Sequence, residues 1–169
     1  MAEIIDLNTV KTSELLSLYS QFNEELRRRE IVRSGNNPTG DLAETLFCRA
    51  FHWRQEKNSK RGYDAIDADN KRNQIKARRL HRRNKSRQLS GLRDLSNDQF
   101  DFLAGVLFDE SYRIQRAAII PKGVVQSRSK YIAHTNSNRF LLHDNVWLEN
   151  GVIDVTERLK NEMALLDTV

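Results

Sequence analysis

The chain has 169 residues, of which 38% are hydrophobic and 30% charged, so it can form one domain with its own core. Its net charge of +5 favours an anionic partner over a neutral one. Between residues 60 and 93 the sequence contains twelve Lys and Arg but only three Asp. This window of net charge +9 could hold phosphates through counterion release.

A single cysteine, Cys48, excludes an internal disulfide and fits the reducing cytosol, so we expect a cytoplasmic protein. The first residues contain no basic region followed by a long apolar run. No apolar stretch in the chain approaches the length of about eighteen residues that marks a membrane span. We therefore expect neither a signal peptide nor a membrane partner.

Apolar residues at helical spacing predict a first helix over residues 8–33, with Asn8 or Thr9 as its cap. These apolar positions are Leu15, Leu16, Tyr19, Phe22 and Leu26. The C-terminal end of this segment is basic and contains Arg27, Arg28, Arg29 and Arg33. The positive charge suits the helix dipole, and the alternative is that this cluster contacts DNA phosphates.

A loop over residues 34–40 precedes a second helix, predicted over residues 39–56. Its apolar face contains Leu42, Ala43, Leu46, Phe47, Ala50 and Phe51. Glu44 lies beside this face in the first turns, where the helix dipole favours an acid. Taken alone, Glu44 is typical of a solvated surface.

The next stretch, after a short loop at residues 58–62, predicts a β-hairpin with strands near residues 63–68 and 73–78. Asp69 and Asn70 form its turn, because both tolerate positive φ. Strict alternation in the second strand puts Gln74, Lys76 and Arg78 on one face. An acid on the first strand, Asp64, would then lie near an amide and a lysine, which suits a divalent cation beside a phosphate.

Glu44, Asp64 and the run Gln74, Ile75, Lys76 resemble the active-site signature of the PD-(D/E)XK nuclease superfamily in its Gln-x-Lys variant. The resemblance covers roughly residues 40–108, and the order of one helix and three strands also matches. It implies an α/β fold with a central mixed β-sheet flanked by helices, as in restriction endonucleases. It further implies that Glu44, Asp64 and Gln74 bind magnesium and that Lys76 assists the attacking water and stabilises the phosphate.

Three positions depart from the superfamily pattern. Tyr63 stands where the motif name has Pro, and Gln74 replaces the commoner Glu, which leaves one carboxylate fewer. Asp67 is a rival for the strand acid, although it would lie on the opposite face from Asp64 in a regular strand.

The residue types suit the chemistry of magnesium. Mg2+ prefers oxygen ligands in octahedral geometry and usually keeps several waters. The ion polarises a phosphoryl oxygen and lowers the pKa of bound water, while a nearby lysine stabilises developing charge. No His pair or Cys cluster in the sequence has zinc spacing.

The segment over residues 79–93 is the most basic in the chain. Because it follows the predicted active-site strand, we expect a loop that contacts phosphates or enters a groove. The candidate DNA-binding residues are Arg78, Arg79, Arg82, Arg83, Lys85 and Arg87. A solvated loop without a partner and a nuclear-localisation signal are the alternatives.

Further along, an apolar run predicts a buried central strand over residues 98–108, third in a meander, and a strand over 114–120 ended by Pro121. A helix is expected over residues 122–134 with Tyr131 facing the core, then a strand over 139–147 with Trp147 in the core. A last helix is expected over 154–166, whose apolar stripe could pack internally or form a dimer contact. We thus expect a single nuclease-like domain over residues 1–169, with a helical part at 8–33, a core at 39–120 and a C-terminal strand and helix at 139–168.

The hypothesis is a magnesium-dependent endonuclease acting on double-stranded DNA, in the setting of a type II restriction enzyme or a related anti-phage nuclease. A homodimer is expected, because cutting both strands needs two active sites. The alternative is a nucleic-acid-binding protein without catalysis, such as a degenerate nuclease or an RNA-binding module. An enzyme acting on RNA or tRNA is a third possibility.

Overall fold

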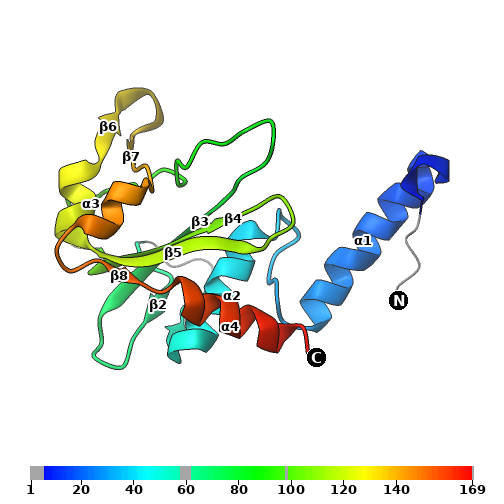
Figure 1. The fold of residues 1–169 in the computed structure, drawn as a ribbon, viewed down its shortest axis with the longest axis horizontal. Helices are drawn as coiled ribbons and strands as arrows, with labels where there is room; N and C mark the ends of the chain where they lie inside the picture. The colour runs from blue at the N-terminus through cyan, green and yellow to red at the C-terminus, as the bar shows by residue number, and fades with distance from the viewer. Residues whose placement is uncertain (1–5, 58–61, 98, 169) are drawn as a thin grey trace.

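A computed structural model of the chain describes residues 6–57, 62–97 and 99–168. Its centre is a mixed six-stranded sheet in the order β1-β2-β3-β4-β5-β8 (Figure 1). The strands are β1 (Arg54–Gln55), β2 (Ala65–Ile66), β3 (Arg72–Arg79), β4 (Phe102–Phe108), β5 (Ile114–Pro121) and β8 (Ile153–Asp154). The expected α/β fold with a central mixed sheet and flanking helices is confirmed.

The helices lie around this sheet. The α-helices are α1 (Thr12–Arg28), α2 (Thr39–Phe51), α3 (Lys122–Arg128) and α4 (Thr156–Leu166). Short 3-10 helices are η1 (Leu7–Thr9), η2 (Ala133–Thr135) and η3 (Asp144–Leu148). Strands β6 (Lys130–Ile132) and β7 (Ser137–Arg139) form a separate hairpin. None of the described helices has both the length and the apolar character needed to cross a membrane.

Strand β4 runs parallel to β3, with Ile75 opposite Ala104, so the expected meander is wrong at its third strand. Parallel neighbours need a long crossover, and residues 80–101 provide it without a helix in their described part. The continuous apolar run of β4 fits this position, because a strand covered on both faces is apolar throughout. Asp98, the first residue of the strand as predicted, lies outside the described residues, as does most of the loop expected at 58–62.

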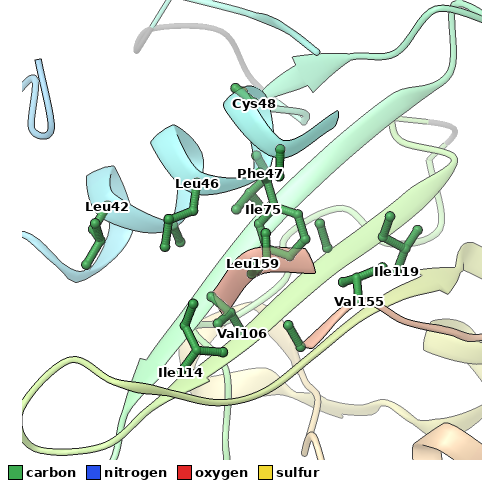
Figure 2. Packing of buried hydrophobic residues seen from close by; sticks show 14 of the residues in the cluster. Leu42, Leu46, Phe47, Cys48, Ile75, Val106, Ile114, Ile119, Val155 and Leu159 are labelled. Carbon is green, nitrogen blue, oxygen red and sulfur yellow. The ribbon is translucent and has the colours of Figure 1, made fainter. Parts of the chain in front are cut away.

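One core lies between the sheet and the pair α2 and α4 (Figure 2). Phe47 of α2, Val106 of β4 and Leu159 of α4 are fully buried there. The apolar stripe of the last helix is therefore packed internally. Burying each of these side chains stabilises the fold by about 1.5–3 kcal/mol.

A second core fills the opposite face of the sheet. Leu89 and Leu92 are fully buried there beside Phe140 and Leu142. The connection after β3 is therefore anchored at two leucines, and the alternative of a wholly solvated loop is wrong for this part. Trp147 is only partly buried at the edge of this core, where the Arg116 guanidinium lies 3.8 Å from its ring centroid.

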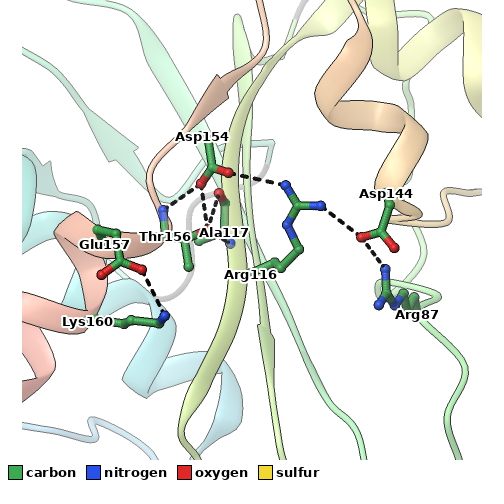
Figure 3. Close-up of polar contacts among 8 residues, drawn as sticks. All are labelled: Arg87, Arg116, Ala117, Asp144, Asp154, Thr156, Glu157 and Lys160. Carbon is green, nitrogen blue, oxygen red and sulfur yellow. Dashed lines mark hydrogen bonds and ion pairs between the residues drawn. The ribbon is translucent and has the colours of Figure 1, made fainter.

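A polar network ties the surrounding elements to β5 (Figure 3). Arg116 of β5 donates to Asp144 of η3 at 2.9 Å and to Asp154 of β8 at 3.2 Å. Asp144 also accepts from Arg87 at 2.8 Å, and Arg87 followed by Arg116 lowers the pKa of this carboxyl. The network fixes the crossover connection to the far edge of the sheet.

Several predicted helices are shorter in the structure. The first ends at Arg28, before the left-handed residue Glu30 (φ 58°), and the second ends at Phe51, before His52 (φ 55°). The third stops at Arg128, because the chain then turns into the β6–β7 hairpin. Tyr131 in that hairpin is 57% exposed, so its expected core position is wrong.

The strand expected over residues 139–147 does not form. Only Arg139 belongs to a strand, and residues 144–148 form η3. Helix α1 stands apart from the body of the molecule in Figure 1. All seventeen of its residues are described, and none of them is buried.

Candidate functional site

Asp64 lies just before β2, at the point where the chain enters the sheet. Its backbone N–H donates to Asn73 O at 2.9 Å, and its Oδ2 accepts from the Ile75 N–H at 2.6 Å. Since Ala65 pairs with Asn73, Asp64 lies opposite Gln74 on the neighbouring strand. The period of two in a strand then puts Asp64, Gln74 and Lys76 on the same face of the sheet.

These three side chains line one pocket of about 1000 Å³. Its floor is the face of the sheet that carries Gln74 and Lys76. Its other walls come from residues 88–94 of the crossover and from the β6–β7 hairpin. The predicted convergence of an acid, an amide and a lysine is therefore present in the fold.

Gln74 carries an unusual feature for a buried residue. Its side chain is 9% exposed, and its Oε1 has no hydrogen-bond partner among the described residues. Leaving a buried carbonyl oxygen unpaired costs about 1–3 kcal/mol. Because Gln74 lines the pocket, a ligand that reached this oxygen would remove that cost.

Three cations also line the pocket: Lys76, Arg93 and Arg139. None of their side chains makes a hydrogen bond or ion pair in the described part of the chain. Two carboxylates, Asp64 and Asp94, share the pocket with them. The cations are thus in excess and available to an anionic ligand.

Glu44 is close to this group but does not line the pocket. Its carboxylate is ion-paired with Arg33 and accepts from Gln55 Nε2 at 3.1 Å. Burial, and after it the charge of Asp64, raises the pKa of Glu44. The two carboxylates therefore interact electrostatically, and Arg33 and Gln55 both bind Oε2 of Glu44, which leaves its Oε1 without a partner among the described residues.

Arg33 and Gln55 are neighbours of the site that sequence reasoning missed. Arg33 was assigned to a basic helix end, yet it lies beyond that helix and against α2. No spacing pattern links Arg33, Glu44 and Gln55, because loops and strand pairing bring them together. The unpaired Arg93 and Arg139 were missed for the same reason.

Asp67, the rival acid, organises the hairpin turn. Its Oδ1 accepts from the backbone N–H groups of Asp69 and Lys71 at 3.0 and 2.8 Å. Asn70 has φ 59°, as the predicted turn requires. The structure thus gives Asp67 a local role, and of the two hairpin acids it is Asp64 that lines the pocket.

The six predicted DNA-binding residues do not line the pocket. Arg79 donates to Glu110 O at 2.8 Å, Arg78 donates to Ser86 O at 3.1 Å, and Arg87 binds Asp144. The remaining three are exposed on the crossover connection: Arg82, Arg83 and Lys85.

The oxygen donors have the chemistry that magnesium requires, though few are carboxylates. No group of three or more His, Cys, Asp and Glu side chains placed to hold a metal occurs in the described ranges. Asp64 and Gln74 Oε1 supply two oxygens, and Mg2+ commonly binds through one or two carboxylates and retained waters. Glu44 could join them through its Oε1, because Arg33 and Gln55 both bind its Oε2.

No protein-family model matches this chain, and no curated protein sequence matches it significantly.

Proposed function

We propose that this chain is a magnesium-dependent nuclease that hydrolyses phosphodiester bonds in double-stranded DNA. One observation carries the proposal: Asp64, Gln74 and Lys76 line the same pocket, in the order and spacing of a PD-(D/E)XK signature. The unpaired Gln74 Oε1 and the raised pKa of Glu44 support it, because both are costs that a bound cation would remove.

Each residue has a distinct role in this proposal. Asp64 and Gln74 would hold Mg2+, and Glu44 would complete the site through its Oε1. Bound magnesium would polarise the phosphoryl oxygen and lower the pKa of its water. Lys76 orients that water and donates to the phosphate oxygen on which charge develops. The substrate-facing side chain of Lys76 has no competing partner among the described residues.

Double-stranded cleavage by this chain requires two sites, so the proposal includes a homodimer. The predicted basic residues of the crossover (Arg78, Arg79, Arg82, Arg83, Lys85 and Arg87) would extend the contact with the DNA backbone. An anti-phage setting, such as restriction, fits an enzyme of this kind.

A second candidate is a nucleic-acid-binding protein without catalysis. The ion pair between Arg33 and Glu44 favours it, because an arginine there does the work of a cation. In this alternative the pocket binds phosphates and magnesium plays no part.

The test is a cleavage assay on plasmid and phage DNA with magnesium or with EDTA. Lys76→Ala is compared with Lys160→Ala, a control on the opposite face, where an exposed lysine pairs with Glu157. We expect magnesium-dependent cleavage in the native chain and in the control, and its loss in Lys76→Ala. DNA binding without cleavage under any divalent ion would favour the second candidate.

A further inference from the structure

We infer that Arg93 and Arg139 form an arginine clamp that holds the backbone of a nucleic-acid strand across the pocket. The inference deepens the proposed function, since it names the substrate contacts of the same pocket. It starts from a short antiparallel pairing between the crossover connection and β7. Leu92 N donates to Asn138 O at 3.0 Å, and Asn138 N donates to Leu92 O at 2.7 Å.

This pairing fixes which way the arginines face. Leu92 is fully buried in the second core, so its neighbours in sequence point to the other side. The same alternation applies on β7 to the neighbours of Asn138. The side chains of Arg93 and Arg139 therefore project from the paired segments on the side of the pocket, and both residues line the pocket.

The two arginines also lie close to each other. In an antiparallel pair with Leu92 opposite Asn138, they occupy diagonal positions, whose Cα atoms are about 7–8 Å apart. Gly91 permits the close approach of the two segments, because a Cβ there would lie 2.6 Å from Ser137 Oγ. Two guanidinium groups at this spacing can bind one strand together.

Phosphodiester groups are the ligand that this arrangement fits best. The planar fork of arginine matches phosphate oxygens and is less strongly hydrated than an ammonium. Neither arginine side chain has a partner in the described part of the chain, so binding breaks no existing ion pair. Lys76 faces the same space from the floor of the pocket. A strand held by the clamp is thereby brought to the lysine.

The experiment measures binding rather than cleavage. A fluorescent DNA duplex is titrated in EDTA with Arg93→Gln, Arg139→Gln and the control Arg113→Gln, an exposed arginine paired with Asp109. We expect each clamp variant to weaken binding about tenfold and to lower the salt dependence by about one counterion, with no change in the control. Urea unfolding verifies that each variant is folded.

Binding within threefold of the native chain for both clamp variants would overturn the inference. A larger loss in Arg82→Gln than in either clamp variant would also overturn it, because the exposed crossover would then be the main contact. Neither result depends on cleavage. A clamp that binds DNA in a protein that never cuts would leave the inference standing while the nuclease proposal fails.

A second inference rests on α1. The geometry points to α1 as the dimerisation helix of this chain, packed against α1 of a second copy. Leu15, Tyr19, Phe22 and Leu26 recur at steps of four, three and four residues, which is the spacing of a coiled-coil seam. Three of them are exposed, by 36%, 57% and 61% for Leu15, Tyr19 and Phe22.

A helix of this kind needs a partner. Most of the stability of helices in proteins comes from packing an amphipathic face rather than from intrinsic propensity. Helix α1 packs no such face within its own chain, since none of its residues is buried. Several of its charged side chains also pair along the helix, for example Arg28 with Glu25 at 2.7 Å. The unmet requirement is therefore apolar.

An antiparallel pair of α1 helices meets this requirement with a self-complementary surface. It would place Leu15 against Leu26 and Tyr19 against Phe22 of the other copy. The acidic first turn of each helix, with Glu14, would lie beside the basic last turn of the other. This arrangement has the two-fold symmetry that most homodimers use.

Sedimentation velocity tests this inference. We expect the native chain to be a dimer at micromolar concentration and Phe22→Glu to be a folded monomer. Leu148→Glu is the matched control, because this leucine is 85% exposed on η3 and far from α1 in sequence, and it should remain dimeric. A monomeric native chain, or a Phe22→Glu variant that still forms the dimer, would overturn the inference.

Discussion

Asp64 performs two tasks that a pair of substitutions can separate. Its Oδ2 accepts a hydrogen bond from the Ile75 N–H at 2.6 Å, which supports the join between β2 and β3. Its negative charge, in the proposed function, holds magnesium. Asp64→Asn keeps an oxygen that can accept from Ile75 but removes the charge, whereas Asp64→Ala removes both.

The structure sets the size of the two effects on stability. Ile75 is 4% exposed, so its N–H cannot turn to water when the acceptor is lost. Leaving a buried donor unpaired costs about 1–3 kcal/mol, and we expect Asp64→Ala to lower the free energy of unfolding by that amount. Asp64→Asn also relieves repulsion with Glu44, so its cost should stay below about 1 kcal/mol.

Urea unfolding measures both stabilities, and a plasmid assay with magnesium measures cleavage. We expect both variants to lose cleavage, while only Asp64→Ala loses substantial stability. Equal destabilisation by the two variants would refute the structural role assigned to the Asp64 oxygen. Cleavage at the native rate by Asp64→Asn would refute its role as a metal ligand.

Three further predictions concern the surroundings of the pocket. Glu44→Gln removes a charge whose ionisation is disfavoured by burial. In urea unfolding near pH 7 the variant should therefore be at least as stable as the native chain, but it should lose cleavage. Because the pKa of Glu44 is raised in the folded state, the native chain should lose stability relative to the variant as pH rises above about 4.5. Gly91→Ala puts a Cβ 2.6 Å from Ser137 Oγ, so we expect a loss of about 1–3 kcal/mol in urea and weaker DNA binding by anisotropy. Asp101→Asn should lower the free energy of unfolding by about 1 kcal/mol at neutral pH, because Arg72 lowers the pKa of this carboxyl. The difference in stability between the variant and the native chain should disappear as pH falls below 3.8. A difference that did not depend on pH would contradict this assignment.

The local part of the site could be predicted from the sequence. The alternation of Gln74 and Lys76 needs only the period of a strand, and the turn at Asn70 needs only a residue that tolerates positive φ. Together they suffice to put Asp64 and Lys76 on one face. The end of β5 at Pro121 is local in the same sense, since proline lacks the N–H that a strand requires.

The distant part of the site could not be predicted, because tertiary pairing decides it. The apolar spacing of the predicted helix continues to residue 134, yet the chain after Arg128 forms a hairpin that pairs with Leu92 through Asn138. That pairing is what brings Arg139 to the pocket. Likewise, the basic composition of the crossover gives no indication that Leu89 and Leu92 are buried. Their burial depends on Phe140 and Leu142, which lie far along the chain.

Three features at or beside the pocket argue for a ligand. Among the described residues, Gln74 Oε1 is buried without a hydrogen-bond partner, Glu44 lies near a second carboxylate, and the side chains of Arg93 and Arg139 are paired with no acid. The first two features lower the stability of the free protein, whereas the exposed arginines cost little and are available to a ligand. Local conflicts of this kind are expected where a sequence serves function rather than folding. A cation would pair with the oxygens and a phosphodiester would pair with the arginines, so the proposed complex with magnesium and DNA would account for all three features.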